Sequence, residues 1–171
     1  MLPRTIILKT ERLYLHEMTA AEAKDAFELN NDPEVIKFTG DPPFESIAAA
    51  QEFLINYTDY QKNGIGRWAV RLLENDTFLG WCGLKLHNNG EVDLGFRFHK
   101  RYWNQGFATE ASFACLDFAF NQKHLKYVIG RVMHENIASQ KVLEKVGMKY
   151  WKDVTCDAHP AKCYRIDNSM Q

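Results

Sequence analysis

The spacing of apolar and polar positions divides the chain into strand-like and helix-like segments. Alternation with a period of two, rich in β-branched and aromatic residues, predicts strands, and apolar residues three and four apart predict helices. The predicted strands cover residues 5–16, 67–73, 78–86, 91–98, 127–132, 149–154 and 162–167. The predicted helices cover residues 19–31, 46–63, 107–121 and 136–146.

Capping and turn residues support several of these boundaries. Thr19 and Glu22 form a capping box, and Asn136 is a favourable N-cap for the last helix. The step Asn89-Gly90 suits a tight hairpin between two of the strands. The order of elements mixes hairpins with crossovers, which predicts one α/β (α+β) domain over residues 1–171. We expect a mixed, largely antiparallel sheet of six or seven strands, with about four helices on its faces.

Charge and composition narrow the classes of partner. The 171 residues are 46% hydrophobic and 25% charged, as in an ordinary globular domain. Twenty-one basic and 22 acidic residues give a net charge of -1, so the field that a general nucleic-acid or membrane-surface binder uses is missing. The apolar run near the N-terminus, residues 6–8, is too short for a signal peptide or a membrane span. We therefore expect a cytoplasmic protein with no nucleic-acid or membrane partner.

The four cysteines show no repeating spacing, which predicts reduced thiols. Cys156, His159 and Cys163 are the only group that resembles a zinc ligand set, and an evident fourth ligand is missing from the nearby sequence. We interpret this segment as a polar connection between two strands and predict no metal site.

The segment 98–110 carries the strongest chemical signal. It runs from the end of a predicted strand, through a turn, into a helix whose first turn contains Gly106 and Ala108. Free backbone N–H groups and the helix dipole favour an anion at a helix N-terminus, and Gly106 has no Cβ to keep a phosphate away. The alternative is that Gly106 only relaxes the turn between strand and helix.

The sequence Trp103-Asn-Gln-Gly-Phe-Ala-Thr-Glu-Ala111 resembles the acetyl-CoA-binding motif of the GNAT superfamily of acyl-CoA N-acyltransferases. The likeness is greatest to the branch of the ribosomal-protein N-terminal acetyltransferases. A second segment, residues 135–148, is similar to the Asn-containing strand-to-helix segment of that family. Trp103 and Asn104 depart from the wider superfamily pattern, in which an Arg or Gln and a frequent glycine occupy these places.

The resemblance implies that acetyl-CoA is a cosubstrate and that its acetyl group moves to a primary amine by direct attack. It also implies that backbone groups of Phe96, Arg97 and Phe98 pair with the pantetheine arm, and that Asn136 hydrogen-bonds this arm near the thioester. The pyrophosphate would be held by the turn and first helical residues, namely Asn104, Gln105, Gly106, Phe107, Ala108 and Thr109.

Attack on a thioester requires a neutral amine, so a proton acceptor is useful. Asp93 is the first candidate, because it lies on the predicted strand that ends in the cofactor turn, where alternation places it with Glu91 and Gly95 on one face. Glu91, Asp157 or a water molecule are the alternatives. Many superfamily members use a tyrosine as thiolate proton donor at the place of Leu143. Ser139, one turn earlier on the same helix face, is our candidate for this role, with a capping role as the alternative.

Several functional questions stay open at this point. The resemblance favours a protein N-terminal amine, such as that of a ribosomal protein, as the acceptor. A small amine (polyamine, amino acid or antibiotic) is an alternative. A CoA-sensing module without turnover and a nucleotide-binding protein are hypotheses from other classes, and the missing P-loop lysine signature argues against the second. Acyl chain length and oligomeric state are not readable from the sequence, and a dimer is one option.

Overall fold

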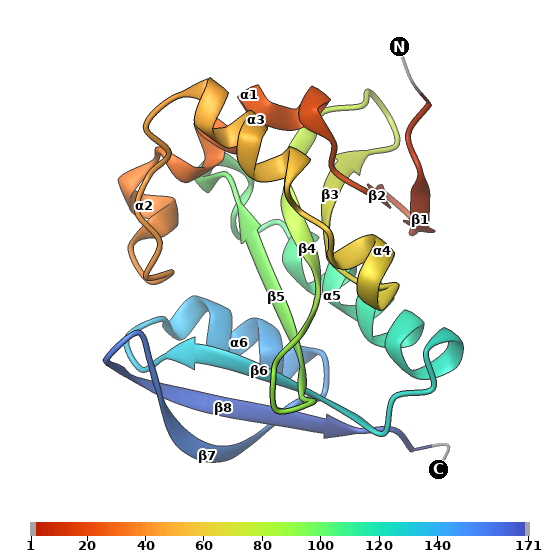
Figure 1. Cartoon of the computed structure of the whole chain (residues 1–171). Helices are drawn as coiled ribbons and strands as arrows, with labels where there is room; N and C mark the ends of the chain where they lie inside the picture. The colour runs from red at the N-terminus through yellow and green to blue at the C-terminus, as the bar shows by residue number, and fades with distance from the viewer. Residues whose placement is uncertain (1–2, 170–171) are drawn as a thin grey trace.

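The computed structural model describes residues 3–169, which form one mixed sheet with helices on its faces (Figure 1). The strand order is β1-β2-β3-β4-β5-β6-β8-β7. Every neighbouring pair is antiparallel except β5 and β6, which confirms the prediction of a mixed, largely antiparallel sheet. The strands are β1 (Ile6–Lys9), β2 (Leu13–His16), β3 (Arg67–Leu72), β4 (Phe78–Leu86), β5 (Val92–Phe98), β6 (Tyr127–Met133), β7 (Lys149–Cys156) and β8 (His159–Asp167).

Six α-helices and three short helical turns connect these strands in the described part of the chain. The α-helices are α1 (Ala23–Asn30), α2 (Pro33–Ile36), α3 (Ile47–Ile55), α4 (Asp59–Asn63), α5 (Phe107–Asp117) and α6 (Ile137–Lys145). The helical turns are η1 (Ala20–Glu22), η2 (Lys100–Tyr102) and η3 (Phe118–Gln122). Within residues 3–169, no helix is both long enough and apolar enough to cross a bilayer.

The sheet has eight strands instead of the expected six or seven, because residues 5–16 form a hairpin and not one strand. Thr10 closes the turn by donating its N–H to the carbonyl of Leu13 at 2.9 Å. Glu110, on α5, accepts from the Thr10 hydroxyl at 2.6 Å and from the Arg12 N–H at 2.9 Å. The turn is therefore fixed by a helix residue about one hundred positions away, which local alternation does not reveal.

The expected helix over residues 46–63 is divided into α3 and α4, and α2 adds a helix that the sequence pattern did not predict. Tyr57 lies in the interruption, where its hydroxyl accepts from the Arg67 N–H at 2.9 Å. Tyr60, on α4, donates its hydroxyl to the carbonyl of the same residue. These two bonds hold α4 at the start of β3. One straight helix over residues 46–63 could not make both of them.

The main core lies between α5 and one face of the sheet. Trp68 of β3, Leu84 of β4 and Leu94 of β5 pack there with Phe107 and Phe118. A smaller cluster between α1 and α3, which includes Ala26 and Ala50, lies apart from this core. A third cluster joins α1 and α2 to the opposite face of the sheet, around Leu29 and Ala69. Helices therefore cover both faces of the central strands.

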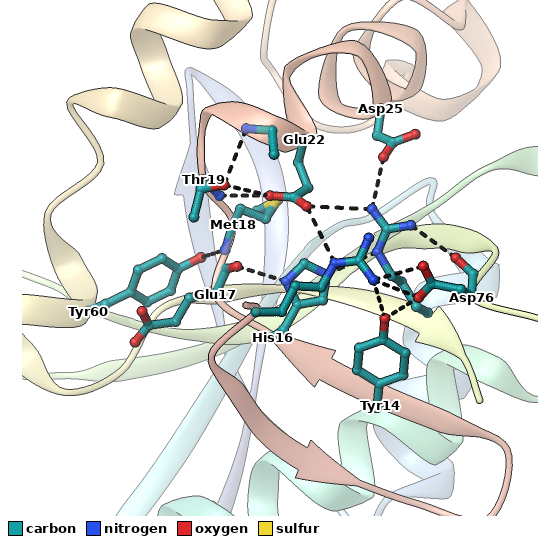
Figure 2. Close-up of polar contacts among 12 residues, drawn as sticks. Tyr14, His16, Glu17, Met18, Thr19, Glu22, Asp25, Tyr60 and Asp76 are labelled. Atoms are coloured by element: carbon teal, nitrogen blue, oxygen red, sulfur yellow. Dashed lines mark hydrogen bonds and ion pairs between the residues drawn. The ribbon is translucent and has the colours of Figure 1, made fainter. Parts of the chain in front are cut away.

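A buried polar network fixes α1 to the edge of the sheet (Figure 2). Arg71 of β3 is only 7% exposed; its Nε donates to Nε2 of His16 at 3.0 Å. The Arg71 Nη2 atom lies 3.1 Å from Asp25 and 3.6 Å from Glu22, which also accepts from the Thr19 N–H at 2.8 Å. These contacts join β2, η1 and α1 to β3. They hold the N-terminal helices over the same sheet face on which Asp93 lies.

Candidate active site

Strands β5 and β6 separate after a single pairing, between Asp93 and Ile129. On its other side, β5 stays paired with β4 as far as Phe98. Residues 94–98 therefore present a backbone edge toward β6 that no strand of the described chain covers, and Figure 1 shows the two strands diverging. A cavity of about 960 Å³ lies at this opening, lined by β5, β6, α6 and the loop of residues 38–44. An uncovered strand edge can pair with an extended ligand arm.

The predicted phosphate-binding turn follows directly from the end of β5. Asn104 and Gly106 have positive φ values of 61° and 80°, and Gly106 is the N-cap of α5. The Glu110 N–H donates to the carbonyl of Gly106 at 3.0 Å, so the N–H groups before it have no partner inside the helix. Arg12 braces the turn from outside by donating to the Gln105 carbonyl at 3.0 Å and to Glu110 at 2.7 Å. The geometry suits an anion.

The structure arranges the predicted cofactor residues along one path. Phe96, Arg97 and Asn136 line the cavity, and residues 104–109 continue beyond the end of β5. Phe98 is 5% exposed, and its carbonyl accepts from the indole N–H of Trp103 at 2.8 Å. That carbonyl already has a partner, so Phe98 can offer fewer backbone hydrogen bonds to a bound arm than Phe96 and Arg97 can. Their contacts with a bound arm stay predictions.

Asp93 lies in the cavity wall, where it is ionised and closely paired. Its Oδ1 atom accepts from Arg67 at 2.7 Å, and its Oδ2 atom contacts Nε2 of His87. Burial alone would raise the pKa of Asp93, but the charge of Arg67 and the hydrogen bonds from His87 and Arg67 lower it to about 2. A carboxylate with this pKa is a poor place for a proton to rest at neutral pH. Of its rivals, Asp157 also lines the cavity, whereas Glu91 pairs with Asn89 in the hairpin turn.

His87 and Arg67 are the site residues that the sequence pattern missed. His87 follows β4 and reaches back across the hairpin to Asp93, while Arg67 comes from β3. The Asn89-Gly90 turn was a usable signal for the first contact, because a short hairpin keeps the residues on its two sides close together. Arg67 lies 26 residues before Asp93, and only the sheet order brings the two together.

The first turn of α6 forms the opposite wall. Asn136 caps the helix, and its Oδ1 accepts from the Ser139 N–H at 3.2 Å. Asn136, Ser139 and Leu143 all line the cavity, and Leu143 is 2% exposed. Ser139 therefore takes part in the cap through its backbone N–H, and within residues 3–169 its hydroxyl has no hydrogen-bond partner; its role as proton donor stays a prediction.

A contact between two segments roofs the acceptor side of the cavity. A Cβ atom placed on Gly40 would lie 2.5 Å from Oδ2 of Asp157, so the loop of residues 38–44 touches the β7–β8 turn. Asp157 and Ala158 both have positive φ values in this turn, 49° and 65°. Asp41 and Asp157 both line the cavity, so this contact forms part of its wall.

The cysteine-rich segment, which we interpreted as a connection between two strands, belongs mostly to the strands themselves, because β7 extends to Cys156 and β8 begins at His159. Cys156 and His159 pair across the β7–β8 hairpin, while Cys163 lies opposite Lys152. All four cysteines are free thiols. Within residues 3–169, no group of three or more His, Cys, Asp or Glu side chains is arranged to hold a metal ion.

Comparison with known proteins identifies the family. The model of the acetyltransferase (GNAT) domain matches residues 12–149, which is more than half of the chain. The chain belongs to this family, and it is an acetyl-CoA-dependent acetyltransferase. It is 29% identical to the uncharacterized N-acetyltransferase p20 of Bacillus licheniformis over 145 residues, covering 83% of this chain and 82% of that protein. It is 30% identical to the uncharacterized protein YkkB of Bacillus subtilis over 153 residues, with coverage of 86% and 87%.

Solved structures confirm the mixed α/β fold. A GNAT-family acetyltransferase from Bacillus anthracis aligns with a TM-score of 0.82 at 24% identity, over 96% of this chain and 99% of that chain. A spermidine N-acetyltransferase from Vibrio cholerae in complex with CoA and spermine has a TM-score of 0.78 at 18% identity, covering 94% and 98%. A putative ribosomal-protein-serine acetyltransferase from the same organism has a TM-score of 0.77 at 19% identity, covering 98% and 99%. At these identities the likeness establishes the fold and not the acceptor.

Proposed function

We propose that this protein moves the acetyl group of acetyl-CoA to a primary amine, by direct attack in the cavity between β5 and β6. The observation that carries this proposal is the uncovered β5 edge, residues 94–98, which ends at the N-terminus of α5. An extended pantetheine arm fits such an edge, and a pyrophosphate fits the free N–H groups at residues 104–109. The cofactor would then run from the helix end to the point where β5 and β6 meet.

The backbone groups of Phe96 and Arg97 would hold the arm, with a smaller share for Phe98. Asn136 lies across the opening on the first turn of α6, within the same cavity, and would bind the arm near the thioester. This placement puts the acetyl group beside Gly95. The amine approaches from the face that carries Asp93, because the opposite face of β5 is packed against α5.

In the reaction, the amine nitrogen bonds to the acetyl carbon, and the carbon–sulfur bond breaks to release CoA. The proton of the amine passes to the Asp93–His87 pair. Asp93 has a pKa of about 2, so His87 is where this proton rests, and Asp93 orients the imidazole. The hydroxyl of Ser139 gives a proton to the departing thiolate. Arg67 keeps Asp93 ionised.

For the acceptor, we keep the N-terminal amine of a protein chain, such as a ribosomal protein, and a small amine as the two candidates. The roof formed by Gly40 and Asp157 supports either an extended chain end or a compact molecule. It disfavours an amine held close to the surface of a folded protein, such as a lysine on a helix. We place the reaction in the cytoplasm.

The test is thiol release from acetyl-CoA with peptides that have free N-termini and with small amines. Ser139→Ala and His87→Gln should each lower kcat by about 100-fold, the usual contribution of general acid–base catalysis, with acetyl-CoA affinity kept. His134→Gln is the matched control, because His134 pairs with Asp153 and lies outside the cavity lining. Unchanged kcat in both site variants would refute the assigned roles. Binding of acetyl-CoA without transfer to any amine would favour the CoA-sensing alternative.

A further inference from the structure

We propose that the acceptor is a compact amine that carries a carboxylate, as an amino acid does, and that Arg131 of β6 binds this carboxylate. The proposal rests on the acetyl transfer proposed above. Of the two candidate acceptors named there, this proposal favours the small amine. Arg131 would be the residue that selects it.

Two carboxylates on the acceptor side of the cavity are already neutralised by arginine. Asp93 pairs with Arg67 at 2.7 Å, and Asp41 pairs with Arg97 at 2.7 Å. A polyamine or another polycation needs free acidic groups, and neither of these is free. The two other acids in the lining, Asp59 of α4 and Asp157 of the β7–β8 turn, form no ion pair within residues 3–169, so a polyamine is the competing acceptor that the experiment must test.

Arg131 lies on the acceptor face of β6, two residues beyond the last pairing with β5. Gly130 faces α6, since a Cβ placed on it would lie 3.0 Å from Leu143. Alternation therefore puts Arg131 on the opposite face, together with Ile129 and its neighbour Asp93. Arg131 also lines the cavity. Its guanidinium is thus beside the opening where the acetyl group is expected.

The charge of Arg131 has no counter-ion in the described chain. Within residues 3–169, no carboxylate lies within ion-pair distance of Arg131, or of Lys85, the other unpaired cation of the cavity. Burial raises the pKa of the Cys156 thiol, and the nearby Arg131 charge opposes this rise. The contact with Cys156 places the guanidinium beside the β7–β8 hairpin, on an exposed part of the cavity wall that an acceptor entering from solvent can reach.

A guanidinium has five N–H donors, so Arg131 can hold a carboxylate in a bidentate manner beside its hydrogen bond with Cys156, and more closely than a lysine ammonium could. Arg131 is only two residues beyond the pairing of Asp93 with Ile129, so it lies near the closed end of the opening between β5 and β6. A carboxylate at Arg131 and an amine at the β5 edge can therefore belong to one compact molecule. The roof at Gly40 and Asp157 further favours a compact acceptor.

The experiment compares kcat/KM for acceptors that differ only in the carboxylate, such as alanine with alaninamide and β-alanine with its amide. Spermidine and a neutral peptide with a free N-terminus complete the panel. Each is measured with the wild type, Arg131→Gln and Arg165→Gln. Arg165 is the matched control, because it lies on the neighbouring strand β8, opposite Ile129, but outside the cavity lining. Differences in amine basicity cancel when the acid-to-amide ratio is compared between variants.

We expect Arg131→Gln to lower the acid-to-amide ratio by at least about tenfold, as for the loss of one charge-assisted, bidentate contact. Arg165→Gln should keep the wild-type ratio, and the KM for acetyl-CoA should stay unchanged in both. An unchanged ratio in Arg131→Gln, or an effect only on the KM for acetyl-CoA, would overturn this assignment while acetyl transfer stands. A wild-type preference for spermidine or the neutral peptide would do the same. No transfer to any amine would instead remove the proposed function itself.

Discussion

Replacement of Gly106 separates backbone strain from loss of cofactor binding. Gly106 has φ of 80°, a conformation that costs an L-residue about 1 kcal/mol, and a Cβ there would lie 3.4 Å from the Arg12 guanidinium. The strain alone should lower the melting temperature of Gly106→Ala by about 2–4 °C in a chain of this size. The new methyl group would also stand where the pyrophosphate approaches the helix end. Acetyl-CoA affinity should therefore fall by at least about tenfold, or about 1.4 kcal/mol.

Gly90→Ala is the control for this prediction, because Gly90 has φ of 86° and open space around a Cβ. Thermal unfolding should show similar losses of stability for the two variants, whereas calorimetric titration with acetyl-CoA should show weaker binding only for Gly106→Ala. Gly106→Glu should abolish binding, since its carboxylate repels the phosphates at the same place. Wild-type affinity in both Gly106 variants would refute the placement of the pyrophosphate at this turn.

The buried network around Arg71 supports two further predictions. Arg71→Met should lower the free energy of unfolding by about 3 kcal/mol, because it leaves Glu22 buried without its nearest arginine. Urea unfolding would measure this loss, and a loss below about 1 kcal/mol would contradict the prediction. Burial lowers the pKa of His16, so the folded protein keeps it neutral while the unfolded chain takes up a proton below about pH 6.5. The free energy of unfolding should thus fall as pH decreases below this value, by at most about 1.4 kcal/mol per pH unit from His16. In urea unfolding at several pH values, His16→Gln should show a smaller dependence of this free energy on pH.

Local patterns predicted the elements of this fold wherever local chemistry decides the structure. The capping box of Thr19, the N-cap at Asn136 and the hairpin at Asn89-Gly90 lie where the sequence indicates them. One error is local, because Asp32 and Pro33 begin the unpredicted helix α2, and the others fall where distant side chains decide the structure. Glu110 folds residues 5–16 into a hairpin, and the bonds from Tyr57 and Tyr60 to β3 divide a predicted helix in two.

In the candidate site, too, the sequence predicted features that depend on neighbouring residues and missed those that depend on residues far away in the chain. Strand alternation placed Asp93 on a face opposite the core, and the resemblance indicated the turn at Gly106. The ionisation of Asp93 was not predictable, because it depends on Arg67 and His87, which the sheet brings to it from other strands. Likewise, nothing in the local sequence of Arg131 indicates that its charge has no partner.

Hydrogen bonds of Glu110 and Arg12 connect the sheet edge to the turn at which we propose that acetyl-CoA binds. Glu110 holds the β1–β2 hairpin through Thr10 and Arg12, and Arg12 in turn holds the Gln105 carbonyl. A ligand bound at this turn should thereby also stabilise the hairpin that contains β1, an outer strand of the sheet. Free outer strands are sites of intermolecular strand pairing and aggregation. The concentration of acetyl-CoA should consequently influence how well this protein resists self-association through β1.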